Sequence, residues 1–500
     1  MALSVIKESK LLARHSVVYG LGNFLNRIVS FLLIPVYTRF LTPNDYGIKE
    51  LVGLSTDVLG ILLATAISSA IYRFYFEYES EKDRSEVIST SIIAIGGAGL
   101  TALAILLFFT RNLAGLIVDN SDLSYFFTIS FVSMWFQSLN DVGYNYLRAN
   151  QKSLRFVVLS FLKMAIAIGL NIYTVCFLKI GVLGILISTL ASAVFMTLVL
   201  VIPMMIKIRL QFSAEKFKEM LKYGLPIVPS QFGAFIVHLS DRFFLKAYCS
   251  IADTGLYSLG YRFGTLPANF ISDPFNQTWQ PRRFEISKQE GAERVFGRIF
   301  TYFLFLISFA GLGVSALTLD VLKIIADPKF WPAYKVVPVI VLASTIFTFH
   351  YHLNMGILIA KKTKYLAYIN FSNGVVVTGL NFLLIPRYGV YGAAYATLIA
   401  FIYKITLTYY FSSRYYKIYF EFMRILKILV SAAFVYAATL LIDVHSVYLN
   451  FLYKFLIIML YPIILYLLRF YSAEELVKVK LFCVSLTTKL KLILRTQQAD

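Results

Sequence analysis

Charged residues and cysteines are scarce in this chain of 500 residues. Only 15% of the residues are charged, whereas 58% are hydrophobic, which is a larger apolar share than soluble globular proteins have. The three cysteines, Cys176, Cys249 and Cys483, are too scattered to indicate a disulfide framework or a metal site. Water is therefore not the main solvent of this protein.

The sequence motifs of common enzymes are also missing. The chain contains no P-loop, no HExxH zinc motif and no GxSxG nucleophile motif. The longest loop expected on the outer side, around residues 320–335, is too short to hold an active site. The sequence therefore favours a protein that is not an enzyme and that uses no cofactor.

What the chain does contain is a long series of apolar runs. Many of them approach the roughly 20 residues that an α-helix needs to cross a membrane. Bounded by charged residues, proline or glycine, they predict an all-α integral membrane protein with about fourteen transmembrane helices. The predicted spans are 14–40, 46–72, 87–110, 123–146, 154–178, 182–206, 224–248, 254–280, 299–320, 335–360, 365–386, 390–412, 425–442 and 448–469.

The basic residues are distributed unevenly among the predicted loops. Lysine and arginine together number 47 against 27 acidic residues, a net charge of +20. One set of alternate loops and termini holds 32 basic residues and the opposite set holds 9, as expected when basic loops remain in the cytoplasm. The bias predicts a multi-pass protein of the inner (plasma) membrane with both termini in the cytoplasm, and it removes the reason to expect a nucleic-acid partner.

The first twelve predicted spans form a duplication. Tyr19-Gly20-Leu21 returns as Tyr223-Gly224-Leu225, and Asp45-Tyr46-Gly47 as Asp253-Thr254-Gly255, at separations of 204 and 208 residues. Each repeat has six helices, so the two repeats are parallel and a site is expected between two lobes. The predicted units are a cytoplasmic lead-in (1–13), an N-lobe (14–212), a C-lobe (213–412), an accessory helix pair (413–470) and a basic cytoplasmic tail (471–500).

Six of the 47 basic residues remain within the spans after the 41 that are assigned to loops, termini and span ends. A charge at the centre of a bilayer costs about 2.5–3.5 kcal/mol on insertion scales, so these side chains should face the protein interior or a watery cavity. Arg27 is the deepest, and Asn23 and Asn26 lie beside it as polar cavity candidates. The candidate cavity cations for substrate binding are Arg27, Arg242, Arg262, Lys163 and Lys404.

Two interpretations of these charges remain open. Arg27 either lines a cavity for an anionic substrate or forms an internal ion pair with Asp57, and the two roles are compatible. His238, Asp241 and Arg242 share one helical face, where they form either a proton-responsive switch or a structural cluster with a satisfied histidine. Asp241 and Arg242 are alternatively solvated at the outer interface. Asp57, Asp241 and His238 are thus the candidates for ion coupling or ion pairing.

The N-terminal stretch Tyr19-Gly20, Asn23, Pro35 and 38-TRFLTPNDYG-47 resembles the Wzx-type polysaccharide and oligosaccharide flippases. These belong to the multidrug/oligosaccharidyl-lipid/polysaccharide (MOP) exporter superfamily. The stretch Gly389-Val390-Tyr391-Gly392-Ala393-Ala394 adds a less specific match. The resemblance implies two lobes in a V-shaped, alternating-access arrangement that moves undecaprenyl-diphosphate-linked oligosaccharide from the cytoplasmic to the outer leaflet.

The same resemblance implies the cargo and the partners. The cargo would be a polyprenyl-diphosphate-linked glycan, such as a repeat unit of O-antigen lipopolysaccharide, capsule or exopolysaccharide. Membrane lipid, glycan polymerase and chain-length machinery would be its partners. Moving a diphosphate outward releases about 2.3 kcal/mol per charge per 100 mV of inside-negative potential, so either the membrane potential or ion antiport would drive transport.

Two other functions compete with this interpretation. A drug or metabolite cation antiporter of the same fold would depend on acidic cavity residues more than on Arg27. A membrane glycan polymerase or ligase would need a long outer loop with catalytic residues, and the sequence predicts none.

Overall fold

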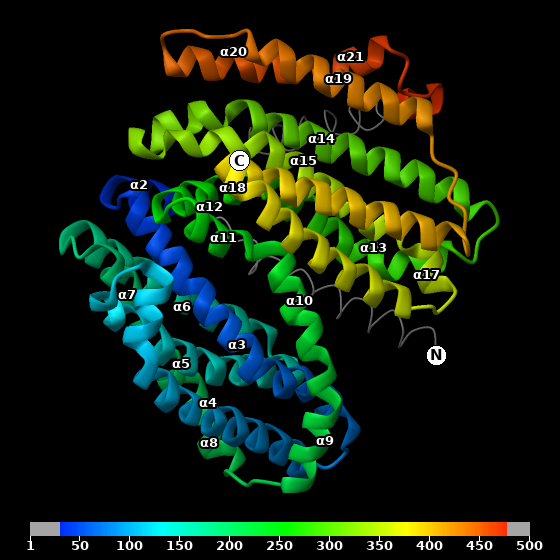
Figure 1. Cartoon of the computed structure of the whole chain (residues 1–500). Coiled ribbons are helices and arrows are strands. Elements are labelled where there is room, and N and C mark those ends of the chain that lie inside the picture. The colour runs from blue at the N-terminus through cyan, green and yellow to red at the C-terminus, as the bar shows by residue number, and fades with distance from the viewer. Residues whose placement is uncertain (1–30, 478–500) are drawn as a thin grey trace, which may run out of the picture.

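The computed structural model describes residues 31–477, and every regular element in that range is a helix. Nine of the described helices are long and apolar enough to span a membrane. Figure 1 shows two lobes that meet at one end, near α2, α11 and α12, and diverge toward the other. The predicted all-α membrane fold is confirmed, whereas the count of fourteen spans stays a prediction.

The N-lobe is a bundle in which α3, α4, α5 and α7 pack against one another. Short π-helical segments, η2 (Tyr173–Phe177) and η3 (Thr197–Val201), extend α6 and join α7 to α8. Its helices are α2 (Ile34–Phe40), α3 (Pro43–Glu77), α4 (Glu81–Val118), η1 (Ser121–Leu123), α5 (Ser124–Ala149), α6 (Ser153–Ile172), α7 (Gly181–Met196), α8 (Ile202–Ile208) and α9 (Ala214–Gly224).

The C-lobe is built from more numerous and shorter helical elements than the N-lobe. Its last helix, α18, turns at Gly389, whose φ of 55° is in the left-handed region that glycine tolerates, so α18 contains two of the predicted spans. The C-lobe elements are η4 (Leu225–Ile227), α10 (Val228–Leu239), α11 (Asp241–Tyr248), α12 (Ile251–Gly264), η5 (Ala268–Ser272), α13 (Asp273–Ile286), α14 (Ala292–Ile325), η6 (Pro328–Val336), α15 (Val337–Thr348), α16 (His350–Leu353), α17 (Met355–Ile359) and α18 (Lys364–Ser413).

Helix α9 occupies a stretch that the sequence predicts as a loop. Its hydroxyl cap is Ser213, and its apolar residue Met220 is fully buried in the N-lobe. Lys216 Nζ lies 2.8 Å from Asp83 Oδ1 and 2.6 Å from Glu86 Oε2 on α4. Burial alone lowers the pKa of Lys216, but these two hydrogen bonds raise it above its usual range. Helix α9 is therefore anchored on the N-lobe, and the chain crosses to the C-lobe at the break η4.

The two lobes meet where α3 packs on α12. A Cβ atom added to Gly47 would lie 1.9 Å from the carbonyl oxygen of Ile251, and one added to Gly255 would lie 2.2 Å from that of Pro43. These two glycines belong to the duplicated Asp45-Tyr46-Gly47 and Asp253-Thr254-Gly255 motifs, so the repeat brings the helices into backbone contact. We call this end of the bundle the closed end.

The aspartates of the same motifs begin the two helices. The Asp45 backbone N–H donates to Thr42 Oγ1 at 3.1 Å, and the Asp253 N–H donates to Ser250 Oγ at 3.0 Å. Such caps satisfy backbone donors that the first turn of a helix leaves free. Each repeated motif therefore starts a helix and allows its close approach to the other lobe.

The accessory pair, α19 (Phe422–Leu440) followed by α20 (Val447–Met459) and α21 (Tyr461–Leu467), forms a layer on α14 (Figure 1). Near the closed end, the fully buried Asp320 of α14 accepts hydrogen bonds from Asn450 and Lys454 of α20. This contact holds the accessory pair at one end of α14. A second ionic contact, centred on Glu475, holds the pair near the other end of α14.

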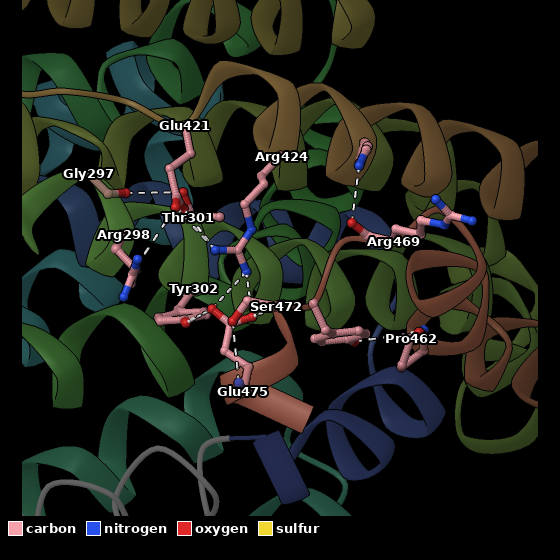
Figure 2. A network of polar contacts seen from close by, with 12 residues as sticks. Gly297, Arg298, Thr301, Tyr302, Glu421, Arg424, Pro462, Arg469, Ser472 and Glu475 are labelled. Carbon is pink, nitrogen blue, oxygen red and sulfur yellow. Dashed lines mark hydrogen bonds and ion pairs between the residues drawn. The ribbon is translucent and has the colours of Figure 1, made fainter. Parts of the chain in front are cut away.

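Figure 2 shows that second contact, in which Glu475 accepts hydrogen bonds from the Tyr302 hydroxyl of α14 and the Arg424 guanidinium of α19. Arg424 also bonds to Glu421 at 3.1 Å. The segment after α21 is thus tied to both α14 and α19.

The close contact at Gly47 leads to a stability prediction. We expect Gly47→Ala to lower the stability by about 1–3 kcal/mol, because the new methyl group meets a backbone carbonyl that cannot rotate away. Gly53→Ala on the same helix is the control, since nothing lies within 4 Å of its Cβ position. Thermal unfolding of the purified protein in detergent measures both. Equal unfolding midpoints for the two variants would contradict the described contact.

Candidate functional site

Three neighbouring cavities extend from one lobe to the other. The inter-lobe cavity, of about 560 Å³, is lined by α3 and α5 of the N-lobe and by α10 of the C-lobe. The N-lobe cavity, of about 700 Å³, shares Ser68 and Asp141 with it. The C-lobe cavity, of about 290 Å³, shares His238 with it. The shared residues place the three cavities side by side at the interface of the lobes.

The inter-lobe cavity has a mixed polar and apolar lining with two acidic groups. Asp57 of α3 and Asp141 of α5 are exposed side chains of this lining, and its other polar residues include Gln137, Gln231 and His238. Among the described residues, neither lysine nor arginine lines this cavity. An ionised group inside a membrane protein carries a large free-energy penalty unless it is paired or hydrated. The exposed carboxylates therefore indicate a water-filled binding or transport space.

The N-lobe cavity contains charges of both signs. Lys163 of α6 and Arg148 of α5 line it together with Asp141. The Arg148 guanidinium lies 4.5 Å from the centre of the Phe156 ring, and Lys163 forms no ion pair in the part of the chain that the structure describes. The cavity therefore offers two cations to an anionic guest.

Two uncharged side chains of the N-lobe cavity also offer polar atoms to a guest. Ser68 Oγ and Asn171 Oδ1 are buried and have no hydrogen-bond partner among the described residues. Buried polar atoms in native proteins normally have a partner. These two atoms are therefore available to water or to a polar ligand.

His238 stands between the inter-lobe and C-lobe cavities. Its ring lies edge-on to Phe347 of α15 at 4.9 Å and tilted to Phe401 of α18 at 5.6 Å. The sequence predicts that His238 shares one helical face with Asp241 and Arg242, and in the structure Ser240 separates α10 from α11 while keeping helical backbone angles. The imidazole packs on Phe347 and Phe401, which line the C-lobe cavity, and the backbone carbonyl of His238 accepts a hydrogen bond from Arg242 Nη1.

Asp241 and Arg242 form a buried pair. Their side chains are 5% and 4% exposed, and Arg242 Nη1 lies 2.6 Å from Asp241 Oδ1. The Tyr257 hydroxyl donates to Asp241 Oδ2 at 2.6 Å, and the Arg242 guanidinium lies 4.0 Å from the Tyr261 ring centre. The structure thus contradicts the expectation that these residues are merely solvated, because both charges are neutralised inside the C-lobe.

Lys404 is also buried, although it has no ion-pair partner among the described residues. Its Nζ lies 4.6 Å from the ring centre of Phe347, and Phe347 lines the C-lobe cavity. Lys404 is therefore behind the cavity wall and not part of its lining.

Arg262 connects the two lobes near the closed end. Its Nη2 lies 2.5 Å from Glu50 Oε1 on α3, and the same oxygen is 2.7 Å from Lys49 Nζ. One carboxylate is shared by two cations, so this cluster carries an excess positive charge. Arg262 is the most accessible of the three, with a side chain that is 36% exposed.

A second ion pair joins the lobes at the same end. Lys246 Nζ of α11 lies 2.7 Å from Asp119 Oδ1 and 2.8 Å from the carbonyl oxygen of Leu116, at the end of α4. Asp119 is two-thirds exposed, so this pair contributes less than a buried one. The cluster of Glu50, Arg262 and Lys49 is the stronger of the two ionic contacts at the closed end, and we call it the latch.

Some of the predicted site residues are brought together and others are not. Asp57 and His238 line one cavity, and Lys163 lines the neighbouring cavity. Asp241, Arg242 and Lys404 are buried outside the cavity linings described here, and Arg262 lies in the latch. Three predicted cavity residues lie outside the described residues: Arg27, Asn23 and Asn26.

Sequence reasoning missed three charged residues that the structure places in these sites. Asp141 lies within a predicted span, so the argument that selected Lys163 could have selected it. Arg148 lies in a predicted loop, between the spans 123–146 and 154–178. Glu50 lies inside the predicted span 46–72, but its partner Arg262 is 212 residues away, and a single sequence gives no signal for that pairing.

Comparison with known proteins finds relatives over most of the chain. A family model described as "Polysaccharide biosynthesis protein" matches residues 36–309, more than half of the chain. A protein of the lsg locus of Haemophilus influenzae is 22% identical over 294 residues, which are 55% of this chain and 67% of that protein.

Two solved structures show the fold. Lipid II flippase MurJ in an inward closed conformation has a TM-score of 0.73 at 17% identity and covers 90% of this chain and 98% of its own. An inward-facing multidrug resistance MATE transporter of the MOP superfamily has a TM-score of 0.62 at 16% identity, covering 81% and 96%. The MOP-type fold expected from residues 19–47 is confirmed.

The latch leads to a conformational prediction. We expect Glu50→Gln to open the closed end, because it removes the carboxylate that holds Arg262 and leaves two cations side by side. Electron–electron distances between spin labels at Asp122→Cys and Lys329→Cys, in a protein whose three native cysteines are replaced by serine, would gain a longer component. Glu77→Gln on the same helix is the control, because its pair with Arg73 is exposed. Identical distance distributions in the two variants would exclude the latch.

Proposed function

The chain belongs to the family of polysaccharide biosynthesis proteins, and from this premise we propose that it is a lipid-linked oligosaccharide flippase. It moves a polyprenyl-diphosphate-linked glycan, a repeat unit of O-antigen, capsule or exopolysaccharide, from the cytoplasmic to the outer leaflet of the plasma membrane. The two lobes alternate between states that open to opposite sides.

The observation that carries this proposal is the polar space between and beside the lobes. Residues 31–477 contain nine apolar candidate spans and adjoining cavities of about 560 and 700 Å³, whose walls hold charges and polar atoms that have no partner within that range. Apolar cargo would need no such walls, whereas a hydrophilic glycan and its diphosphate would. The size and chemistry of the space support a large polar cargo.

The charges suggest separate roles within this space. Lys163 and Arg148 provide donors for the diphosphate, because charge-assisted hydrogen bonds to phosphate oxygens are strong. Asp57 and Asp141 accept hydrogen bonds from sugar hydroxyls or hold a coupling cation in the inter-lobe cavity. With the closed end sealed by the Gly47 contact and the Glu50 latch, cargo enters between the diverging ends of the lobes.

Release on the other side requires the latch to open. Breaking the Glu50–Arg262 pair frees an arginine beside the path, which attracts the diphosphate toward the closed end. The membrane potential favours outward movement of the two negative charges. Ion antiport through Asp57 or His238 is the other source of energy that this arrangement supports.

A cation antiporter is the second candidate function. Its support is the inter-lobe cavity, where the charged lining residues among those described are the carboxylates of Asp57 and Asp141. Carboxylates attract cationic drugs or metabolites, whereas an anionic cargo relies on the N-lobe cavity and the latch. Asp57 has a role in both functions, so the two functions differ in whether Lys163 is required.

Genetic complementation separates the two candidates. In a strain that lacks its own glycan flippase, we expect the wild-type chain to restore surface glycan, measured by staining of the separated polysaccharide. Lys163→Gln should reduce the restored glycan at least fivefold, because the diphosphate loses a cavity cation. Lys152→Gln is the matched control, since Lys152 is an exposed residue at the start of the same helix.

The same strains test the alternative. Arg27→Ala and Asp57→Ala are compared with wild type both for surface glycan and for resistance to the cation ethidium. If the wild-type chain restores no glycan and raises ethidium resistance in a manner that depends on Asp57, the flippase proposal is wrong and the antiporter is correct.

A further inference from the structure

A separate crevice lies between the C-lobe and the accessory pair, away from the three cavities of the transport path. It has a volume of about 220 Å³ and is located at the closed end, near the end of α14 and the start of α20. Five segments contribute to it: α14, the stretch from η6 into α15, α18, α19 and α20. We call it the accessory crevice. Its polar lining residues include Tyr334, Lys335, Tyr391, Tyr436, Thr439 and Lys454.

The crevice carries one uncompensated positive charge. Lys454 Nζ lies 3.0 Å from the fully buried Asp320, so these two charges neutralise each other. Lys335 is exposed and forms no ion pair in the described part of the chain. Asp320 is the structural partner of Lys454, and Lys335 remains available to a ligand.

The tyrosines add neutral donors to this charge. The hydroxyl groups of Tyr334, Tyr391 and Tyr436 form no hydrogen bond within residues 31–477. The three tyrosines come from different segments, η6, α18 and α19, and line the same small space as Lys335. A phenol donates one hydrogen bond and an ammonium donates up to three. The crevice is thus lined by hydrogen-bond donors, and no free carboxylate is among its described lining residues.

We propose that the accessory crevice binds the phosphate group of an anionic phospholipid from the surrounding leaflet. Phosphate oxygens accept several hydrogen bonds at once. Their negative charge would also provide the ion-pair partner that Lys335 does not have among the described residues. The volume of about 220 Å³ is less than half that of the inter-lobe cavity and is sufficient for a phosphate group. Bound there, the lipid contacts the C-lobe and α19 together and so stabilises the accessory pair. This inference does not depend on the proposed transport function.

Lipid titration of the purified full-length protein tests the site. The delipidated protein in detergent is titrated with phosphatidylglycerol, and bound lipid is counted by native mass spectrometry. We expect Lys335→Gln to weaken the binding of one phosphatidylglycerol at least fivefold and Tyr436→Phe at least twofold. Lys329→Gln is the matched control, because Lys329 is an exposed lysine of the same segment η6 outside the crevice.

Further titrations identify the group that is recognised. Diacylglycerol, which has the chains without the phosphate, should not occupy the site. Inorganic phosphate that displaces phosphatidylglycerol from wild type, but not from Lys335→Gln, would show that free phosphate uses the same donors. If phosphate does not compete while phosphatidylglycerol still depends on Lys335, the lipid headgroup is the ligand. Binding of diacylglycerol equal to that of phosphatidylglycerol, or no effect of Lys335→Gln, would overturn the proposal.

Discussion

The backbone contact between α3 and α12 determines how the rest of the molecule is arranged. Gly47 and Gly255 allow two helices from different lobes to approach until carbonyl oxygens occupy the space of a side chain. The lobes are thereby joined at one end and must diverge elsewhere (Figure 1). Glu50 and Arg262 lie about one turn and two turns beyond these glycines, and Asp57 lies two further turns along α3, where the inter-lobe cavity begins.

Most of the buried charges discussed above are paired, although Lys404 is an exception. Glu50 with Arg262 and Asp320 with Lys454 join different elements, and Asp241 pairs with Arg242 within α11. In the cavities, charges face open space, as Asp57 and Asp141 do. Pairing reduces the penalty of removing a charge from water, whereas an unpaired charge must be hydrated or bind a ligand. The paired charges therefore hold the fold, whereas Asp57 and Asp141 line the inter-lobe cavity.

The sequence predicts the fold class well because membrane helices are encoded locally. Apolar length, basic loops and the repeated Asp-Tyr-Gly and Asp-Thr-Gly motifs are visible without any three-dimensional information. Helix α9 escaped prediction because its charged face resembles a loop, although Met220 packs into the N-lobe. The pairing of Glu50 with Arg262, and the choice of Asp241 as the partner of Arg242, depend on how the lobes and helix breaks place the side chains. Hydropathy carries no information on those placements.

Transport in reconstituted vesicles tests the central claim most directly. The purified protein is placed in liposomes with undecaprenyl-diphosphate-linked N-acetylglucosamine, and exposure of the sugar on the opposite leaflet is followed with a membrane-impermeant galactosyltransferase. The account predicts protein-dependent exposure of the sugar that is accelerated by a potential that is negative on the donor side. Absence of sugar translocation in vesicles that nevertheless move ethidium would contradict it.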